Sequence, residues 1–506
     1  MARTGKNPSA KRPKKGKRVS KKVAAAAAET RRWTLLSFAI IAAALVFRLA
    51  VNSFGVVPVH FDEAQYWAYG QELDWGYFSK PPLVAGAIRL TTDLMGDSLF
   101  GLRLSSPLSH AAIATLIFLT ARRLFGAAVG FWSSVGYTLA PGVGISSMIV
   151  STDPIMMVFW AIALYALVRA GPEERIWWAV IGLSIGLGML AKYTMVAFAG
   201  GLIGWMLFSA PQRDWRGLGL ALGVAALVVM PNILWNADNS FATVTHVAED
   251  AAPGGSLFNP GKLAEFVGAQ FGVIGVVFFA AMCLALWKRR TWLAEPEMRL
   301  LAWQTFPLLL AITCLAFVTR AQPNWAVPAY VAGSIVAAQW LVKLHRERWI
   351  LWGQLVLSTA AVALVLLAAV VFRTGPDWPR PADPFKKMRI AEPFCERALG
   401  VMAEEGAEIL LSDDRRRLSE CMFLGGLSWD EIAVWNPDLI PENHHELVAT
   451  LYPGDDRVML LALLGPGGRI AQQFEEAREI EAGRFATHSD RQIGFSLWVV
   501  EGFRGY

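Results

Sequence analysis

The 506-residue chain is 55% hydrophobic and only 17% charged, and its mean hydropathy is +0.40. Soluble proteins carry about 25% charged residues, so this composition excludes an ordinary water-soluble fold and predicts a chain that crosses a membrane many times. The 21 tryptophans agree with this prediction, because tryptophan is enriched where hydrocarbon meets water. The net charge of +6 is uneven and gathers before the first apolar run.

That basic segment, residues 1–32, contains the run KNPSAKRPKKGKRVSKK. Such a run can bind nucleic acid, but beside an apolar run the simpler interpretation is a cytoplasmic tail that faces anionic lipid. We therefore expect no nucleic-acid partner. The apolar run from about Trp33 to Val51 is too long for the core of a typical signal peptide and ends without a clear cleavage site. A retained first span is predicted.

A helix crosses the hydrocarbon layer in about 20 apolar residues. By this measure the sequence predicts a polytopic α-helical protein of about eleven spans, near 33–54, 105–121, 126–147, 154–169, 176–191, 194–210, 216–235, 261–287, 298–318, 325–342 and 349–372. Arginine and lysine recur in alternate loops, on the side of the basic N-terminus. Cytoplasmic loops carry such an excess, which predicts a multi-pass protein of the bacterial inner membrane with a cytoplasmic N-terminus and a periplasmic C-terminus.

This division gives a transmembrane domain over 33–373, with a long outer loop at 55–104, and a small soluble α/β domain over 374–506 on the outer side. In the latter, helices are predicted at 385–404, 414–423 and 468–480, and strands at EILLS, RVMLLALL and FSLWVVEGF. Cys395 and Cys421 fall in this domain, where oxidising conditions allow a disulfide. Two cysteines alone leave their pairing open.

The first outer loop is rich in aromatic residues and opens with Asp62 and Glu63. The pattern predicts an amphipathic helix whose Tyr66, Trp67 and Tyr69 are available for the membrane interface. An acid in a first helical turn is often only a favourable partner of the helix dipole. That explanation does not account for the other ionisable residues expected on the same face, which are Lys80, Asp153, Lys192 and Arg320.

Ionisable groups at membrane depth are costly and are usually functional or paired. Two acidic positions and three cations on one face suit glycosyl transfer from a lipid phosphate. A carboxylate would take the proton of an acceptor hydroxyl, cations would stabilise the leaving phosphate, and apolar walls would exclude water. The sequence shows no nucleotide-binding motif in a strand–turn–helix context.

The membrane region resembles the GT-C glycosyltransferases of the protein O-mannosyltransferase and lipid A aminoarabinose transferase type, and more narrowly their bacterial family-39-like members. The resemblance rests on FDEAQYWAYGQELDWGYFSKPPLVAGAIRL, STDPIMMVFWAIALYAL, GLGMLAKYTM, PNILWNADNSF and PNWAVPAY, in this order over about residues 55–335. It implies a sugar donor carried on a polyprenyl phosphate, a lipid, glycan or protein acceptor, and inversion at the sugar.

The resemblance also assigns roles to residues. It implies that Asp62 is the catalytic base, that Glu63 positions the loop or contacts the acceptor, and that Asp153 orients the acceptor or a metal. Cations near the donor phosphate would be Lys80, Lys192 and Arg320. Further residues on the expected side of the membrane, taken as candidates for the substrate cavity, are Tyr66, Trp235, Asn236 and Asn324. His246 is expected to be solvated.

Several alternatives remain open at this stage. No cofactor is firmly implied, and a divalent metal at Asp62 and Asp153 is left open because two acids without a histidine cluster do not define a site. A transporter for a lipid-linked sugar would also need intramembrane charges, but the sequence shows no paired halves with broken helices. A non-catalytic assembly protein would leave the charged, aromatic outer loop unexplained.

Overall fold

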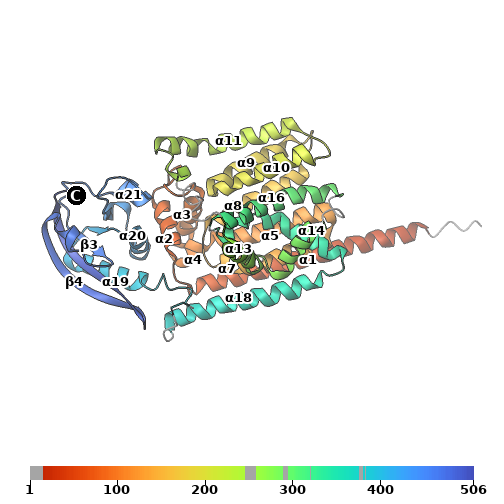
Figure 1. The fold of residues 1–506 in the computed structure, drawn as a ribbon. Helices are drawn as coiled ribbons and strands as arrows, with labels where there is room; N and C mark the ends of the chain where they lie inside the picture. Colours follow the sequence, from red (N-terminus) through yellow and green to blue (C-terminus); the bar gives the residue numbers. More distant parts are fainter. Residues whose placement is uncertain (1–14, 246–257, 289–293, 320, 375–379, 382) are drawn as a thin grey trace, which may run out of the picture.

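A computed structural model describes residues 15–245, 258–288, 294–319, 321–374, 380–381 and 383–506, without the side chains of residues 15–22 and 374. The predicted residues Arg320 and His246 lie outside this part of the chain. The membrane region is a bundle of helices that run side by side (Figure 1). The C-terminal domain lies at one end of this bundle, and the start of the first helix lies at the other.

The bundle follows from the apolar runs of the sequence. Helices long and apolar enough to cross a membrane number six within the described residues. They lie in α1 (Lys15–Ser53), α4 with α5 (Leu99–Arg103, Ser105–Phe125), α8 (Thr152–Arg169), α11 (Trp215–Asp238), α16 (Pro296–Val318) and α18 (Arg348–Thr374). Shorter helices fill the spaces between them, namely α3 (Leu83–Met95), α6 (Ala127–Thr138), α7 (Pro141–Ser146), α9 (Arg175–Ala191), α10 (Val196–Phe208) and α17 (Ala329–Lys343).

Two predicted spans are broken. The run 126–147 becomes α6 and α7, because Pro141 at the start of α7 cannot donate a hydrogen bond to continue α6. The run 261–287 becomes α13 (Pro260–Val273) and α14 (Val276–Trp287), which meet at 119°. Gly275 between them has φ +92, a left-handed conformation that favours glycine. Both breaks border the cavity described below.

The C-terminal domain has a five-stranded sheet in the order β2-β1-β3-β5-β4. The central strands β1 (Ile409–Ser412) and β3 (Met459–Leu463) are parallel, with Leu410 opposite Leu460. The remaining strands are β2 (Ile432–Val434), β4 (Phe474–His488) and β5 (Arg491–Phe503). Of the helix predicted at 468–480, only its start forms, as α22 (Gly468–Ala471); the rest is wrong, because the chain enters β4 at Phe474 and pairs antiparallel with β5.

Helices α19 (Ala391–Glu405) and α20 (Arg415–Gly425) pack on this sheet and are joined by a disulfide between Cys395 and Cys421. Helix α20 also packs on α2 (Phe61–Gln71) of the first outer loop. Figure 1 shows α2 between the C-terminal domain and the helical bundle. The prediction that Tyr66, Trp67 and Tyr69 are available for the membrane interface is therefore wrong, since these side chains are buried in protein.

Candidate active site

Asp62 sits in the first turn of α2, which His60 caps. The Nδ1 atom of His60 accepts a hydrogen bond from the backbone N–H of Asp62 at 3.2 Å. The same nitrogen lies 3.5 Å from the Asp62 carboxylate, but an atom that accepts the backbone proton cannot also donate one to that carboxylate. Asp62 is 45% exposed. Within the described residues, no donor occupies its oxygens, so the carboxylate is available to accept a proton.

Glu63, the next residue, is held on all sides. Its carboxylate forms a two-point ion pair with Arg103 at 2.7 and 2.8 Å, and both side chains are only 1% exposed. It also accepts the backbone N–H groups of Val150 at 2.9 Å and His60 at 3.0 Å. Both carboxylate oxygens are therefore already occupied by hydrogen-bond donors. Glu63 therefore positions α2 rather than serving as a base.

Asp153 lies in the first turn of α8 and joins three parts of the bundle. One oxygen accepts Lys192 Nζ at 2.7 Å, and the other accepts Asn324 Nδ2 at 2.8 Å. Lys192 is the C-cap of α9, and Asn324 lies in the short helix η2 (Pro323–Ala326). The side chains of Asp153 and Lys192 are 10% and 22% exposed, respectively. The two charges balance each other, and the pair joins the end of α9 to the start of α8.

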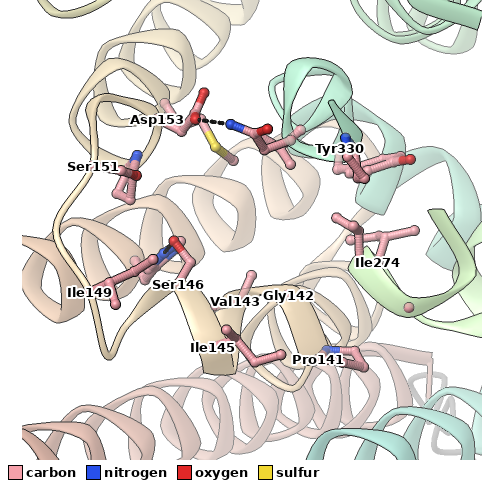
Figure 2. A pocket seen from close by; sticks show the side chains of 18 of the residues that line it. Pro141, Gly142, Val143, Ile145, Ser146, Ile149, Ser151, Asp153, Ile274 and Tyr330 are labelled. Carbon is pink, nitrogen blue, oxygen red and sulfur yellow. Dashed lines mark hydrogen bonds between the residues drawn. The ribbon is translucent and has the colours of Figure 1, made fainter. Parts of the chain in front are cut away.

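These groups border one cavity of about 730 Å³. Its polar end is formed by His60, Asp62, Glu63, Tyr66, Asp153 and Asn324, and most of its remaining wall is apolar. The apolar wall comes from the broken helices, with Pro141 to Ile145 on α7 and Phe271 to Ile274 at the end of α13. Figure 2 shows Asp153 and Tyr330 at one end of the cavity and α7 at the other.

The other predicted site residues lie elsewhere. Trp235 donates from Nε1 to Asp74 at 2.5 Å, and Asn236 donates to Tyr193 at 3.3 Å. Trp235 thereby holds the outer loop against α11, Asn236 contacts the turn after α9, and neither residue lines the cavity. Lys80 forms a β-bridge with Tyr77 and is also outside the set of residues that line it.

Sequence reasoning missed several polar residues of the cavity wall. His110 of α5 contacts the Tyr137 hydroxyl at 2.9 Å and Ser146 Oγ at 3.1 Å. Tyr330 of α17 donates its hydroxyl proton to Gln270 at 2.5 Å and is buried. A histidine inside an apolar run was the signal that could have identified His110. Tyr330 offered no such signal.

A metal would find few free ligands in this wall. Both oxygens of Asp153 already accept hydrogen bonds, and Glu63 is saturated by its four donors. Among the described residues, no group of three histidine, cysteine, aspartate or glutamate side chains is placed to share an ion. The Lys192 ammonium supplies the positive charge beside Asp153 instead.

Comparison with known proteins agrees with this architecture. A family model described as dolichyl-phosphate-mannose-protein mannosyltransferase matches residues 79–235. ArnT from Cupriavidus metallidurans, solved in the apo state and bound to undecaprenyl phosphate, superposes with a TM-score of 0.63 at 15% identity. The match covers 92% of this chain and 98% of that one. At this identity the likeness concerns the fold alone.

Two relatives with higher sequence identity are glycosyltransferases. An undecaprenyl phosphate-alpha-4-amino-4-deoxy-L-arabinose arabinosyl transferase of Pseudomonas fluorescens is 31% identical over 213 residues, 37% of this chain and 38% of that protein. The lipid A galacturonosyltransferase RgtD of Rhizobium johnstonii is 34% identical over 406 residues, 79% of this chain and 85% of that protein. The chain therefore belongs to the family of this galacturonosyltransferase, the integral-membrane glycosyltransferases of the GT-C fold.

Proposed function

We propose that this enzyme moves a sugar from a polyprenyl monophosphate to a lipid or glycan acceptor of the lipid A type, on the periplasmic side of the inner membrane. The observation that carries the proposal is a half-exposed Asp62 carboxylate that opens on a cavity with an apolar wall. Such a cavity suits a donor with a polar head and an isoprenoid chain. The name of RgtD and the undecaprenyl phosphate bound to ArnT support the same donor and acceptor classes.

In this proposal the donor chain lies against α7 and the end of α13, and its phosphate lies near Lys192. Asp62 takes the proton of the acceptor hydroxyl. The acceptor oxygen bonds to the anomeric carbon while the bond from that carbon to the phosphate oxygen breaks, with inversion, and polyprenyl phosphate leaves. Lys80 and Arg320 remain proposed phosphate contacts, and positive charge at the leaving group stabilises the transition state.

We also propose that the shorter helices α6 with α7, α9, α10 and α17 cross the membrane, as does the bent pair of α13 and α14. This arrangement would give the eleven crossings expected from the sequence. Basic residues in the last turns of α5, α8 and α17 support a cytoplasmic location for those ends. The disulfide between α19 and α20 supports a periplasmic location for the C-terminal domain.

Catalysis is proposed to need no resident metal, because Lys192 already balances the charge of Asp153. Treatment of the purified enzyme with EDTA, followed by removal of the chelator, is expected to leave the transfer rate unchanged. The rate is measured with a polyprenyl-phosphate sugar and lipid A. A loss of activity that added Mg²⁺, Mn²⁺ or Zn²⁺ restores would contradict this expectation.

The function is tested by mass spectrometry of envelope lipids and glycans from three strains. These are a wild-type strain, a deletion strain, and the deletion complemented with Asp62→Asn. Both mutants are expected to lack one sugar on an envelope glycolipid and to accumulate the polyprenyl-phosphate sugar. Loss of a general base lowers a rate by about 10²–10⁴-fold. A variant that restores the wild-type glycolipid would remove Asp62 from the mechanism.

A further inference from the structure

The C-terminal domain brings two arginines close to α2, the helix that carries Asp62. Arg415 and Arg416 form the first turn of α20, the helix that packs on α2. The guanidinium carbon of Arg416 lies 5.1 Å from the centre of the Phe61 ring. Phe61 immediately precedes Asp62, whose side chain lines the cavity. Residues more than 350 positions later in the chain therefore lie beside the proposed base.

Apart from the contact of Arg416 with the Phe61 ring, no charged partner is paired with these two arginines within the described structure. Arg417, the next residue, turns inward and pairs with Glu420 at 2.5 Å. Arg416 is exposed and Arg415 is half-buried, and neither has an ion-pair partner among the described residues. The nearby acids are Asp413, which is exposed, and Asp414, which caps the N-terminus of α20.

Arg415 lies within electrostatic reach of Tyr69, another residue of α2. Burial raises the pKa of the Tyr69 hydroxyl, and the nearby charges of Arg415 and Asp62 act on it with opposite signs. Arg415 and Asp62 therefore lie within electrostatic reach of the same hydroxyl group. A positive charge is thus held on the water-facing side of α2, while the Lys192–Asp153 pair lies at the bundle.

This placement is rigid. Trp429 donates from Nε1 to the backbone carbonyl of Ala68 at 3.0 Å, and Trp67 packs edge-on against Phe423 at 5.5 Å. The disulfide of Cys421 ties α20 to α19. Groups fixed before binding lose less entropy when a ligand arrives. The two guanidinium groups are therefore prepared for an anion that approaches from the aqueous side.

We propose that Arg415 and Arg416 bind a phosphate group on the headgroup of the acceptor lipid and so direct its hydroxyl toward Asp62. This inference rests on the proposed function and adds that the acceptor is a phosphorylated glycolipid. Guanidinium groups bind phosphate through paired, charge-assisted hydrogen bonds. A neutral glycan acceptor has no phosphate, so it would not form charge-assisted hydrogen bonds with these two arginines.

The test measures binding without transfer. The full-length protein in nanodiscs of phosphatidylcholine is titrated with a deacylated glucosamine disaccharide that carries two phosphates, and with the same disaccharide after phosphatase treatment. Wild-type protein is expected to bind the phosphorylated probe at least about tenfold more tightly. The double variant R415A/R416A is expected to bind both probes alike. R504A, which removes an exposed arginine after β5, serves as the control and should retain the preference.

Equal binding of both probes by the wild-type protein would overturn the inference. So would a double variant that keeps the preference, or one that loses affinity for both probes equally, because the latter result indicates only a structural role. No donor is present, so a charged donor sugar cannot produce the effect. The Asp62→Asn variant is expected to keep the phosphate preference while it loses transfer. A wild-type protein that shows the preference but never transfers sugar would refute the proposed function and leave the arginine site standing.

Discussion

Adjacent residues of the same charge have different surroundings in this protein. The Asp62 carboxylate has no hydrogen bond from His60, because Nδ1 of His60 accepts a hydrogen bond from the backbone N–H of Asp62 and so carries no proton to donate. Glu63 points the other way, into Arg103. The sequence predicted that both acids matter and left open whether Glu63 positions the loop or contacts the acceptor. Arg103 lies 40 residues from Glu63, and nothing local in the sequence indicates that pairing.

The substitution Glu63→Gln tests this difference. It leaves the Arg103 charge buried without a full counter-charge, which costs about 3–5 kcal/mol when one partner of a buried pair is removed. We expect a marked fall in the thermal unfolding temperature of the purified protein in detergent. Asp62→Asn is the matched control and should unfold within about 0.5 kcal/mol of the wild type, as exposed substitutions do. If Glu63→Gln and the wild type had the same unfolding temperature, the Glu63–Arg103 pair would add nothing to stability.

Among single residues, those within continuous motifs were the most predictable. Asp153 and Lys192 were both predicted, and the structure adds that they contact each other directly. Trp235 and Asn236 were predicted for the cavity because they lie on the correct side of the membrane. In the structure, Trp235 instead fixes the outer loop to α11, and Asn236 donates to Tyr193. Sidedness can be inferred from charge patterns, but the direction of a side chain depends on how helices pack.

At the scale of elements, the long apolar runs predicted the helices, and their interruptions were missed. The segment 468–480 has alanine, glutamate and arginine, which favour helices, yet its residues 474–480 form the first half of β4. That strand is at the edge of the sheet, and its exposed charged residues are typical of edge strands. Pairing with β5 along almost its whole length outweighs the weak helical preference.

The break between α13 and α14 yields a second prediction at this scale. A Cβ atom at Gly275 would lie 1.6 Å from Gln354 Oε1, and the positive φ would strain any other residue. Gln354 itself holds the break by donating to the carbonyls of Gly136 and Ile274. Gly275→Ala is therefore expected to cost at least about 1–3 kcal/mol of stability and to lower transfer, because the neighbouring residues line the cavity.

The matched control for this substitution is Gly268→Ala, in the same helix α13. A Cβ atom there meets nothing within 4 Å, and Gly268 does not line the cavity. Alanine also favours a helix over glycine by about 1 kcal/mol, so this variant should unfold no earlier than the wild type and keep its activity. Thermal unfolding and transfer rate are measured for both variants. If Gly275→Ala behaves like Gly268→Ala, the broken helix does not require glycine.

For the whole molecule, the C-terminal domain packs on α2, the helix that carries Asp62, instead of standing apart from the bundle. Its residues Phe394 and Trp429 belong to the same buried core as Trp67 and Tyr69 of the outer loop. The sequence placed the boundary near residue 374 and predicted a small domain, but a boundary in the chain says nothing about what the domain contacts. Long-range packing of this kind cannot be read from local patterns, because the contacting residues are far apart in sequence.

The position of this domain relative to the membrane gives the last prediction. The start of α1 and the C-terminal domain lie at opposite ends of the bundle (Figure 1). The basic N-terminal segment favours the cytoplasm, and the disulfide favours an oxidising compartment. Alkaline phosphatase fused after Tyr506 should therefore be active, since it folds only when exported. The same enzyme fused after Arg213, in the loop between α10 and α11, should be inactive. Two fusions of equal activity would contradict the proposed topology and, with it, a base at Asp62 that faces the periplasm.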